Sequence, residues 1–156
     1  MKLSLHRPSL VLGGVALLAL AAGAAHPEDG GTPAAAGLVG VHWRWVHFSP
    51  PGAAPPLVPQ HPERYWLEFR ADGGLAFQAD CNRGAGTWTH QGAELKLQAL
   101  ATTLAACPTG SLDSRFTQLL GAVRRASVLG RTLLLRLSDG GVLHFEAAPD
   151  EAPRAP

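Results

Sequence analysis

Short alternating apolar runs, separated by glycine turns, restrict this chain to a β-rich fold. In the run 64–70 every second side chain is apolar, and the alternation resumes at 75–79 after an Asp-Gly-Gly turn at 72–74. Alternate residues of a strand share a face, and Asp-Gly favours a tight turn, so the pattern predicts an antiparallel hairpin. The same criteria predict a second hairpin at 132–147, around an Asp-Gly-Gly turn at 139–141.

Several shorter runs predict further strands around these hairpins. An aromatic, alternating segment at 41–48 is typical of a strand, and 87–89 and 94–98 predict two more. The residues 127–129 could add another. Together these runs predict about seven or eight short strands, paired mainly antiparallel because short turns join them.

One segment, 111–125, has helical rather than strand periodicity. Its apolar residues recur at spacings of three and four and so form one stripe: Leu112, Phe116, Leu119, Leu120 and Val123. Arg124 and Arg125 would then lie at the negative end of the helix dipole. We therefore expect an α+β fold, in which a small, curved, mainly antiparallel sheet carries one covering helix at about 111–125.

The first residues of the chain have the parts of a secretory signal peptide. Lys2 and Arg7 are basic, the run 10–22 is apolar and uncharged, and small residues follow, so cleavage is expected near Ala24 or Ala25. The apolar run has about 13 residues, fewer than the roughly 20 that span a membrane. We expect export to the periplasm or the exterior of a bacterium, with no membrane span after cleavage. A retained N-terminal anchor is the alternative.

Segments rich in proline and glycine set the limits of the folded domain. Residues 26–37 are expected to form a flexible linker and 148–156 a disordered tail, which leaves one domain at 38–147. Inside the domain, six prolines in 49–62 predict a long loop without regular strand pairing.

The net charge argues against two classes of partner. Loss of the signal peptide would remove Lys2 and Arg7 and change the formal charge from +1 to −1. A chain so close to neutral is not expected to bind nucleic acid or membrane surfaces in general. We expect a monomer without cofactor or metal.

Cys81 and Cys107 are the two cysteines of the chain. In an exported protein such a pair favours a disulfide, which here would close a loop of about 27 residues and contribute about 3.5 kcal/mol. Two buried free thiols or a reactive pair are the alternatives. The cysteines form no Cys-x-x-Cys motif, which disfavours a thiol oxidoreductase.

The residues around the cysteines resemble a known family, the META domain (HslJ-like) family. The matching residues form two groups about twenty positions apart: Cys81, Asn82, Gly86 and Trp88, and then Thr103, Ala106 and Cys107. Trp43 and Trp45 correspond to the family's tryptophan near the domain start, and the resemblance covers about 39–147.

The resemblance implies a small α+β domain of the bacterial envelope. Members of the family are linked to the heat-shock response, to outer-membrane lipoproteins and to resistance against a hydrophobic antibiotic, and no catalytic residues can be transferred from them. The chain departs from the family at Asp80, where glycine usually precedes Cys-Asn. Aspartate adopts positive φ less readily than glycine, so the local turn could differ.

Three residues are candidates for a ligand or partner surface: Trp66, Asn82 and Arg83. Trp66 is out of phase with the apolar side chains of its strand and would lie exposed beside the proline-rich loop. Asn82 and Arg83 lie in a glycine-rich bend that could present N–H groups and a guanidinium to an anion. The alternative is a plain turn in which the Asn82 side chain bonds nearby backbone.

The sequence shows no recognisable nucleophile–base pair, metal-ligand spacing or phosphate loop, so we predict no catalytic residue and no enzyme. We expect a non-catalytic envelope protein that acts in stress or binds an apolar ligand or another envelope protein. The alternative is a structural or inhibitory module that presents the loop 49–62 to an envelope protein or a protease. A hydrolase with dispersed residues ranks last.

Overall fold

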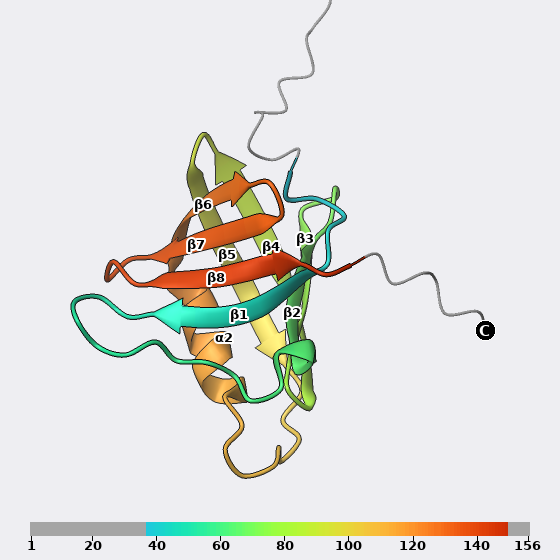
Figure 1. The fold of residues 1–156 in the computed structure, drawn as a ribbon. Helices are drawn as coiled ribbons and strands as arrows, with labels where there is room; N and C mark the ends of the chain where they lie inside the picture. Colours follow the sequence, from blue (N-terminus) through green and yellow to red (C-terminus); the bar gives the residue numbers. More distant parts are fainter. Residues whose placement is uncertain (1–36, 150–156) are drawn as a thin grey trace, which may run out of the picture. The chain divides into compact units, whose positions relative to one another are not determined.

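Alternating buried and exposed side chains build eight strands in residues 37–149, the part of the chain that the computed structural model describes (Figure 1). The strands are β1 (Trp43–Ser49), β2 (Tyr65–Phe69), β3 (Gly74–Ala79), β4 (Asn82–Gln91), β5 (Glu94–Thr102), β6 (Val123–Leu129), β7 (Thr132–Leu137) and β8 (Val142–Ala147). A 3-10 turn, η1 (Pro62–Arg64), precedes β2. One α-helix within the described residues, α2 (Asp113–Gly121), lies between β5 and β6.

These strands form a closed antiparallel barrel. Each strand pairs with the next along the chain, and β1 also pairs with β8, so the first and last strands meet. On β1, Trp43 lies opposite Leu67 of β2, and Trp45 lies opposite Phe145 of β8. Because the sheet closes on itself, neither its first nor its last strand presents a free edge.

Large inward side chains fill the barrel. Phe116 of α2 is fully buried, and its ring centroid lies 4.9 Å from Trp45, 5.6 Å from Tyr65 and 6.2 Å from Phe145. Aromatic pairs at such separations add to the stabilisation that burial itself provides. Since these rings occupy the middle of the barrel, its interior is a packed hydrophobic core.

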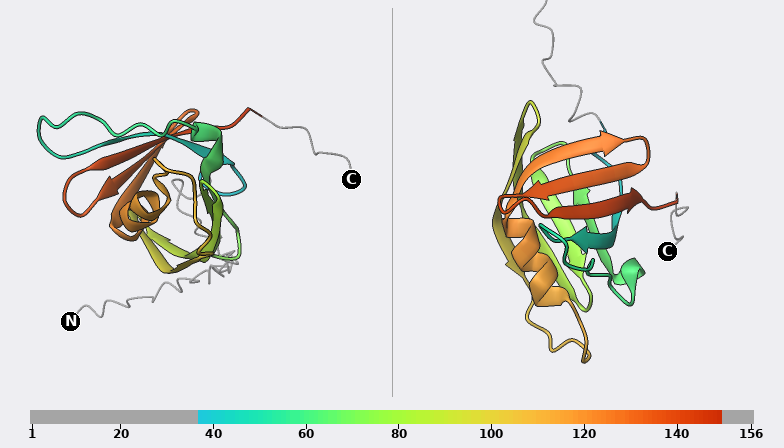
Figure 2. Two further views of the ribbon diagram at one scale, coloured as in Figure 1. Left: turned by 90° about the horizontal axis from the view of Figure 1, so that it is seen from below. Right: turned by 60° about the vertical axis from the view of Figure 1, so that its left-hand side comes forward.

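The helix enters the barrel where two strands separate. β5 and β6 share a single register pair, Glu94 with Arg125, so their remaining lengths diverge. Figure 2 shows α2 beside β5 at this gap, and the helix contacts both β5 and β3. Its buried side chains are Phe116, Leu119 and Leu120. The helix therefore replaces the missing strand pairing with apolar contacts.

The expected open, curved sheet with a covering helix is wrong, because the sheet is a closed barrel. Alternation within a strand predicts which side chains share a face, but it does not predict that the first strand pairs with the last. The helix therefore fills the space where β5 and β6 separate, and it does not cover one face of an open sheet.

The helix is also shorter than the expected 111–125. It ends at Gly121, and β6 begins at Val123, so Arg124 and Arg125 are strand residues. Val123 is fully buried on β6. Its inward position on the strand happens to continue the helical stripe, which explains the error. Arg124 donates from Nη1 to the carbonyl of Gly121 at 3.3 Å and thereby satisfies an oxygen at the helix end.

The glycine-rich segment expected to bend at 82–86 belongs instead to the long strand β4. The ring of Phe77 on β3 lies where a side chain on Gly84 would be. A Cβ on Gly86 would lie 2.8 Å from the carbonyl oxygen of Gln98 on β5. These glycines therefore allow neighbouring strands to pack closely, which is a common reason for glycine inside a strand.

The predicted signal peptide (1–25), most of the predicted linker (26–36) and the end of the tail (150–156) lie outside the described residues. Within residues 37–149, no helix combines the length and the apolar character that crossing a membrane requires.

We predict that Gly84→Ala destabilises the domain, because the new methyl group must displace the ring of Phe77. Overpacking of this kind costs about 1–3 kcal/mol. Gly121→Ala is the matched control, since a Cβ at this position would have no atom within 4 Å and alanine is the better helix former. Urea unfolding should show a loss for the first variant and none for the second. Equal stability of Gly84→Ala and the native chain would contradict the packing described here.

Candidate functional site

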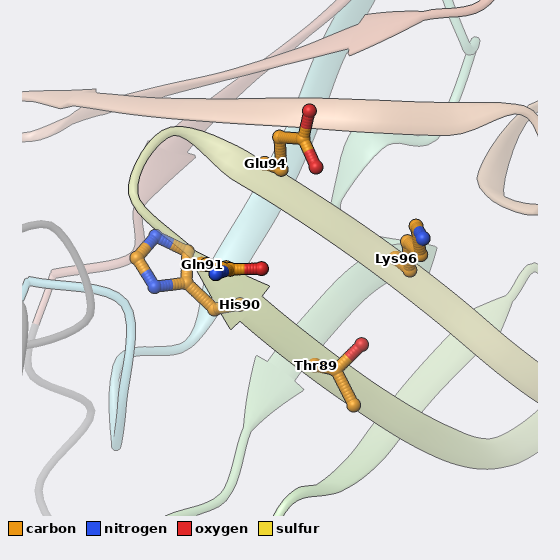
Figure 3. Close-up of a pocket in the computed structure, with 5 residues that line it drawn as sticks. All are labelled: Thr89, His90, Gln91, Glu94 and Lys96. Carbon is orange, nitrogen blue, oxygen red and sulfur yellow. The ribbon is translucent and has the colours of Figure 1, made fainter.

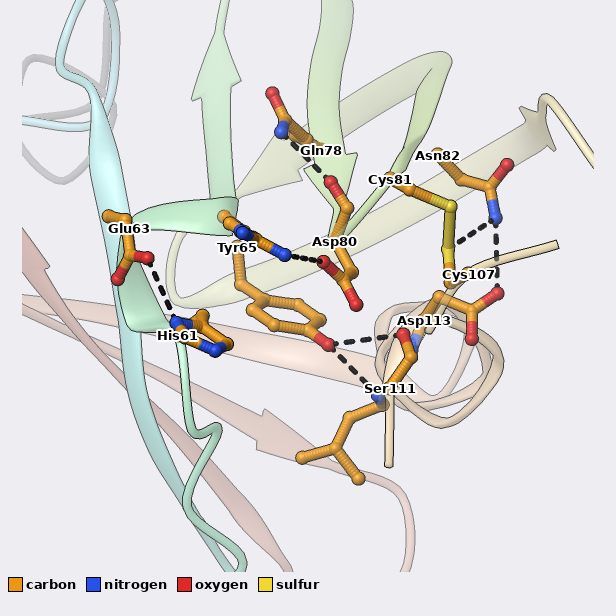
Figure 4. A network of polar contacts seen from close by, with 12 residues as sticks. His61, Glu63, Tyr65, Gln78, Asp80, Cys81, Asn82, Cys107, Ser111 and Asp113 are labelled. Atoms are coloured by element: carbon orange, nitrogen blue, oxygen red, sulfur yellow. Dashed lines mark hydrogen bonds and ion pairs between the residues drawn. A yellow bond between two sulfur atoms is a disulfide. The ribbon is translucent and has the colours of Figure 1, made fainter. Parts of the chain in front are cut away.

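The cysteine motifs meet at one end of the barrel, where they hold the loop that leads into α2 (Figure 4). A disulfide joins Cys81, in the turn between β3 and β4, to Cys107, in the loop after β5, with 5.5 Å between the two Cα atoms. The predicted disulfide is thereby confirmed, and the free-thiol alternative is wrong. Cys81 is exposed and Cys107 is half-buried, so the bridge lies at the surface.

Asn82 is buried beside this bridge, and both the oxygen and the nitrogen of its side-chain amide form hydrogen bonds within the protein. Its Oδ1 accepts from Thr103 Oγ1 at 2.9 Å and from the Ala105 N–H at 2.8 Å. Its Nδ2 donates to the Ala105 carbonyl at 3.2 Å, to Cys107 Sγ at 3.3 Å and to Asp113 Oδ2 at 3.1 Å. A buried amide with every group paired fixes its neighbours in place. Asn82 therefore clamps the loop after β5 onto β4 and the start of α2.

The first turn of α2 is held by a second set of polar contacts. The hydroxyl of the buried Tyr65 accepts from the Leu112 N–H at 2.8 Å and lies 3.4 Å from Ser111 Oγ. Ser111 Oγ also accepts from the Asp113 N–H at 3.2 Å. These bonds satisfy N–H groups that a helix start leaves without partners. They also set where the helix enters the barrel.

Asp80, at the position where the resembled family usually has glycine, adopts a conformation that glycine favours. Its φ is +55°, and aspartate is among the few residues that tolerate this region. Its side chain is 7% exposed and pairs with Arg64, whose Nη1 lies 3.4 Å from Asp80 Oδ1. A cavity of about 80 Å³ adjoins this pair and is lined also by Ser111.

A cross-strand row of planar and cationic side chains runs over the outer wall of β1 to β4. Arg44 lies opposite Trp66, Trp66 opposite Gln78, and Gln78 opposite Arg83. We name these four residues the outer strip. Residues in register on neighbouring strands lie about 5 Å apart between Cβ atoms, so the four side chains form one continuous surface. Arg44 is also paired with Glu146 of β8, at 3.6 Å.

Trp66 is half-buried and contacts two neighbours on the outer wall. Its Nε1 donates to Gln78 Oε1 at 3.1 Å, and Gln78 Nε2 donates in turn to the Asp80 carbonyl at 2.9 Å. The ring of His42 lies 4.5 Å from the Trp66 ring between centroids. His42 also lines a cavity of about 400 Å³ between the start of β1 and the end of β8, with Val41 and Arg131 among its other walls. A fixed aromatic surface therefore borders a hollow.

A second hollow of about 270 Å³ lies at the β4–β5 hairpin (Figure 3). Thr89 faces Lys96, and Gln91 faces Glu94, across the two strands. The charges of Glu94 and Lys96 are opposite, so this hollow has no net preference for an ion of either sign. His90 also lines it, and its Nε2 is buried without a hydrogen-bond partner among residues 37–149.

Two histidines stack on the outer wall where β1 meets β8. The rings of His47 and His144 lie 4.0 Å apart between centroids, and His144 Nε2 lies 3.3 Å from Ser49 Oγ. Burial lowers the pKa of His144 below its ordinary value of 6.5, and the positive charges of His47 and Arg136 lower it further. The neutral imidazole is therefore favoured in the folded protein.

The three predicted surface residues have different surroundings. Trp66 and Arg83 lie in the same outer strip, as members of one row. Asn82 is 4% exposed, begins strand β4, and makes its hydrogen bonds to residues 103–113 rather than to the backbone of a local turn. Arg44 and Gln78 were missed, although each is a polar residue out of phase with its apolar neighbours and could have been found by that signal.

We predict that Asn82→Asp destabilises the domain by about 2–3 kcal/mol, because it removes the amide donor that bonds three acceptors and places a carboxylate beside Asp113. The double variant Asn82→Asp with Asp113→Asn restores a donor to this contact and should recover part of the loss. Chemical unfolding of the native chain, both single variants and the double variant measures the difference. Additive effects of the two substitutions would contradict the clamp.

We predict that stability falls as the pH drops through 6.5, because the unfolded chain then binds a proton at His144 more readily than the folded chain does. Unfolding of the native chain at pH 7.5 and pH 5 measures the change. His144→Gln should reduce it, whereas the control His61→Gln, in an exposed contact with Glu63, should not. The prediction fails if His144→Gln keeps the full pH dependence.

Two solved structures are similar to this fold. One is an NMR structure of a protein from Burkholderia xenovorans, with a TM-score of 0.62 and 19% identity, covering 71% of this chain and 83% of that one. The other is a crystal structure of a DUF4847 family protein from Bacteroides vulgatus, with a TM-score of 0.50 and 16% identity, covering 70% and 93%. At these identities the similarity shows the fold alone. No protein with a curated description matches the chain.

The sequence itself matches a family model, described as the META domain, over residues 36–150. The matched region includes the disulfide, the Asn82 clamp and all eight strands of the barrel. The resemblance of the two cysteine motifs is thereby confirmed, and the chain belongs to the META domain family.

Proposed function

We propose that this META domain is a non-catalytic binding module of the bacterial envelope, exported by its N-terminal signal, and that it binds a partner protein through the outer strip. The observation that carries the proposal is the continuous row of Arg44, Trp66, Gln78 and Arg83 on the outer wall. Tryptophan and arginine are the residues that most often dominate the free energy of protein–protein binding.

The filled interior favours a binding site on the outside. Phe116 and the rings around it occupy the space that an enclosed apolar ligand would need. Trp66, in contrast, lies on the outer wall and is fixed in place by Gln78 and His42. A side chain that is already ordered loses little conformational entropy on binding, which favours affinity.

The polar cluster around the disulfide supports a structural role over a catalytic one. Asn82 is fully paired within the protein, and Asp80 is paired with Arg64. The hollow beside them is small, at about 80 Å³. These groups are occupied in holding the loop and the helix, which supports a module that does not turn over a substrate.

The proline-rich loop is the second candidate surface, favoured by one observation. Leu57, within the loop, pairs with Phe48 of β1 through two backbone hydrogen bonds of 2.8 and 2.9 Å. These bonds hold the loop against β1 at this point. Residues 51–56 are exposed and project beyond the barrel (Figure 1), and Val58 is 59% exposed. A partner could therefore bind the projecting part while the fastened part fixes its direction.

Trp66→Ala should weaken binding of an envelope partner more than tenfold, because it removes the aromatic centre of the outer strip. Partners would be captured by photo-crosslinking from a residue of the strip, identified by mass spectrometry and then measured as purified proteins. The melting temperature should fall far less than for Trp45→Ala, which removes a fully buried ring.

A second variant separates the two candidate surfaces. Replacing residues 51–56 with a glycine–serine segment of equal length leaves the outer strip intact. Loss of binding in this variant, with binding unchanged in Trp66→Ala, would contradict the strip and favour the loop. Loss in Trp66→Ala alone supports the strip.

A further inference from the structure

Two arginines face each other on β6 and β7. In the strand order of the barrel, β5 and β8 separate these strands from β1 to β4, which carry the outer strip. Arg125 of β6 lies in register with Arg136 of β7, and both side chains are exposed. Like charges in register on antiparallel strands repel one another and destabilise the sheet. The domain therefore carries an unfavourable pair that its fold does not require.

Neither arginine forms an ion pair with an acid within residues 37–149. The three ion pairs between described residues involve other side chains, and neither Arg125 nor Arg136 belongs to them. Glu94 is in register with Arg125 on β5, but the two charged groups are not within 4.0 Å. Arg136 also lowers the pKa of His144 on the adjacent strand, as a positive potential would.

Apolar side chains share this wall with the arginines. Leu129 lies on the same outward face of β6 as Arg125 and is 65% exposed. Leu134 lies on the same outward face of β7 as Arg136 and is half-buried. Alternate residues of a strand point to one side, so the arginines and leucines form a single surface. We name Arg125, Leu129, Leu134 and Arg136 the basic wall.

From the basic wall we infer a docking surface for a membrane that contains anionic phospholipid. The two guanidinium groups match phosphate in charge and hydrogen-bonding geometry. A free phosphate ion would make no favourable contact with the exposed leucines. A membrane interface offers both anionic headgroups for the arginines and apolar chains for the leucines. The inference does not depend on the outer strip, because the basic wall lies on β6 and β7 and the strip on β1 to β4.

Vesicle binding by the full chain tests the inference. Vesicles containing phosphatidylglycerol should bind the native chain, and the double variant Arg125→Gln with Arg136→Gln should bind them about thirtyfold more weakly, from the usual contribution of each arginine near a membrane. Arg136→Gln and Arg70→Gln are matched single changes, and the latter alters an exposed arginine outside the basic wall. All variants keep the same N-terminal residues, so these contribute equally throughout.

Residue-resolved NMR provides a second measurement that the N-terminal residues do not mask. Monomeric dihexanoylphosphatidylglycerol should shift the amide signals of β6 and β7, and dihexanoylphosphatidylcholine should not. The double variant should be as stable as the native chain or more so, since the repulsion between the arginines is gone. Weaker binding without loss of stability distinguishes a docking surface from a structural role.

Three results would overturn the inference. One is equal binding of the native chain and the double variant together with amide shifts elsewhere. Another is equal binding to phosphatidylglycerol and phosphatidylcholine. A third is binding of inorganic phosphate at the basic wall that blocks the vesicles while Leu129→Ser and Leu134→Ser change nothing, which would assign the wall to a free anion. Weaker vesicle binding in both leucine variants supports the lipid.

Discussion

The insertion of Phe116 into the barrel is the contact on which the rest of this structure depends. Its ring packs on aromatic side chains from β1, β2 and β8, and so links the strands where the barrel closes. A buried phenylalanine of this kind typically stabilises a domain by about 3–5 kcal/mol relative to alanine. The disulfide, Asn82 and Tyr65 all act on the segment that delivers this ring. The two cysteine motifs of the family therefore serve to position α2.

The sequence predicted the local structure better than the closure of the barrel. The hairpin around 72–74 and the outward direction of Trp66 follow from alternation alone, because each depends on residues a few positions apart. The pairing of β1 with β8 joins segments nearly a hundred residues apart, and a pattern within either segment cannot predict it. Gly84 was misread for a related reason, since its role depends on the ring of Phe77 on another strand.

The net charge of the chain did not predict the basic wall. A formal charge close to zero, +1 for the whole chain and −1 without the signal peptide, argued against membrane surfaces in general, but a sum over the chain carries no information on where the charges lie. The helical reading of 111–125 also placed Arg125 at a helix end, where a cation is favourable. Because β6 begins at Val123, Arg125 instead lies in register with Arg136 on β7 and with Glu94 on β5. The position of one boundary between helix and strand thus decides which charged residues lie beside this arginine.

The closed, filled barrel gives the two outer surfaces a fixed relation to each other. β8 separates the basic wall from the outer strip on one side, and β5 separates them on the other. Because a close-packed core deforms little under load, a partner on one surface does not need to disturb the other. Enclosed ligand sites require a cavity and often a moving lid, and the aromatic core provides neither. The two proposed surfaces can therefore be occupied at the same time, while the disulfide keeps the loop that leads into α2 in place at one end of the barrel.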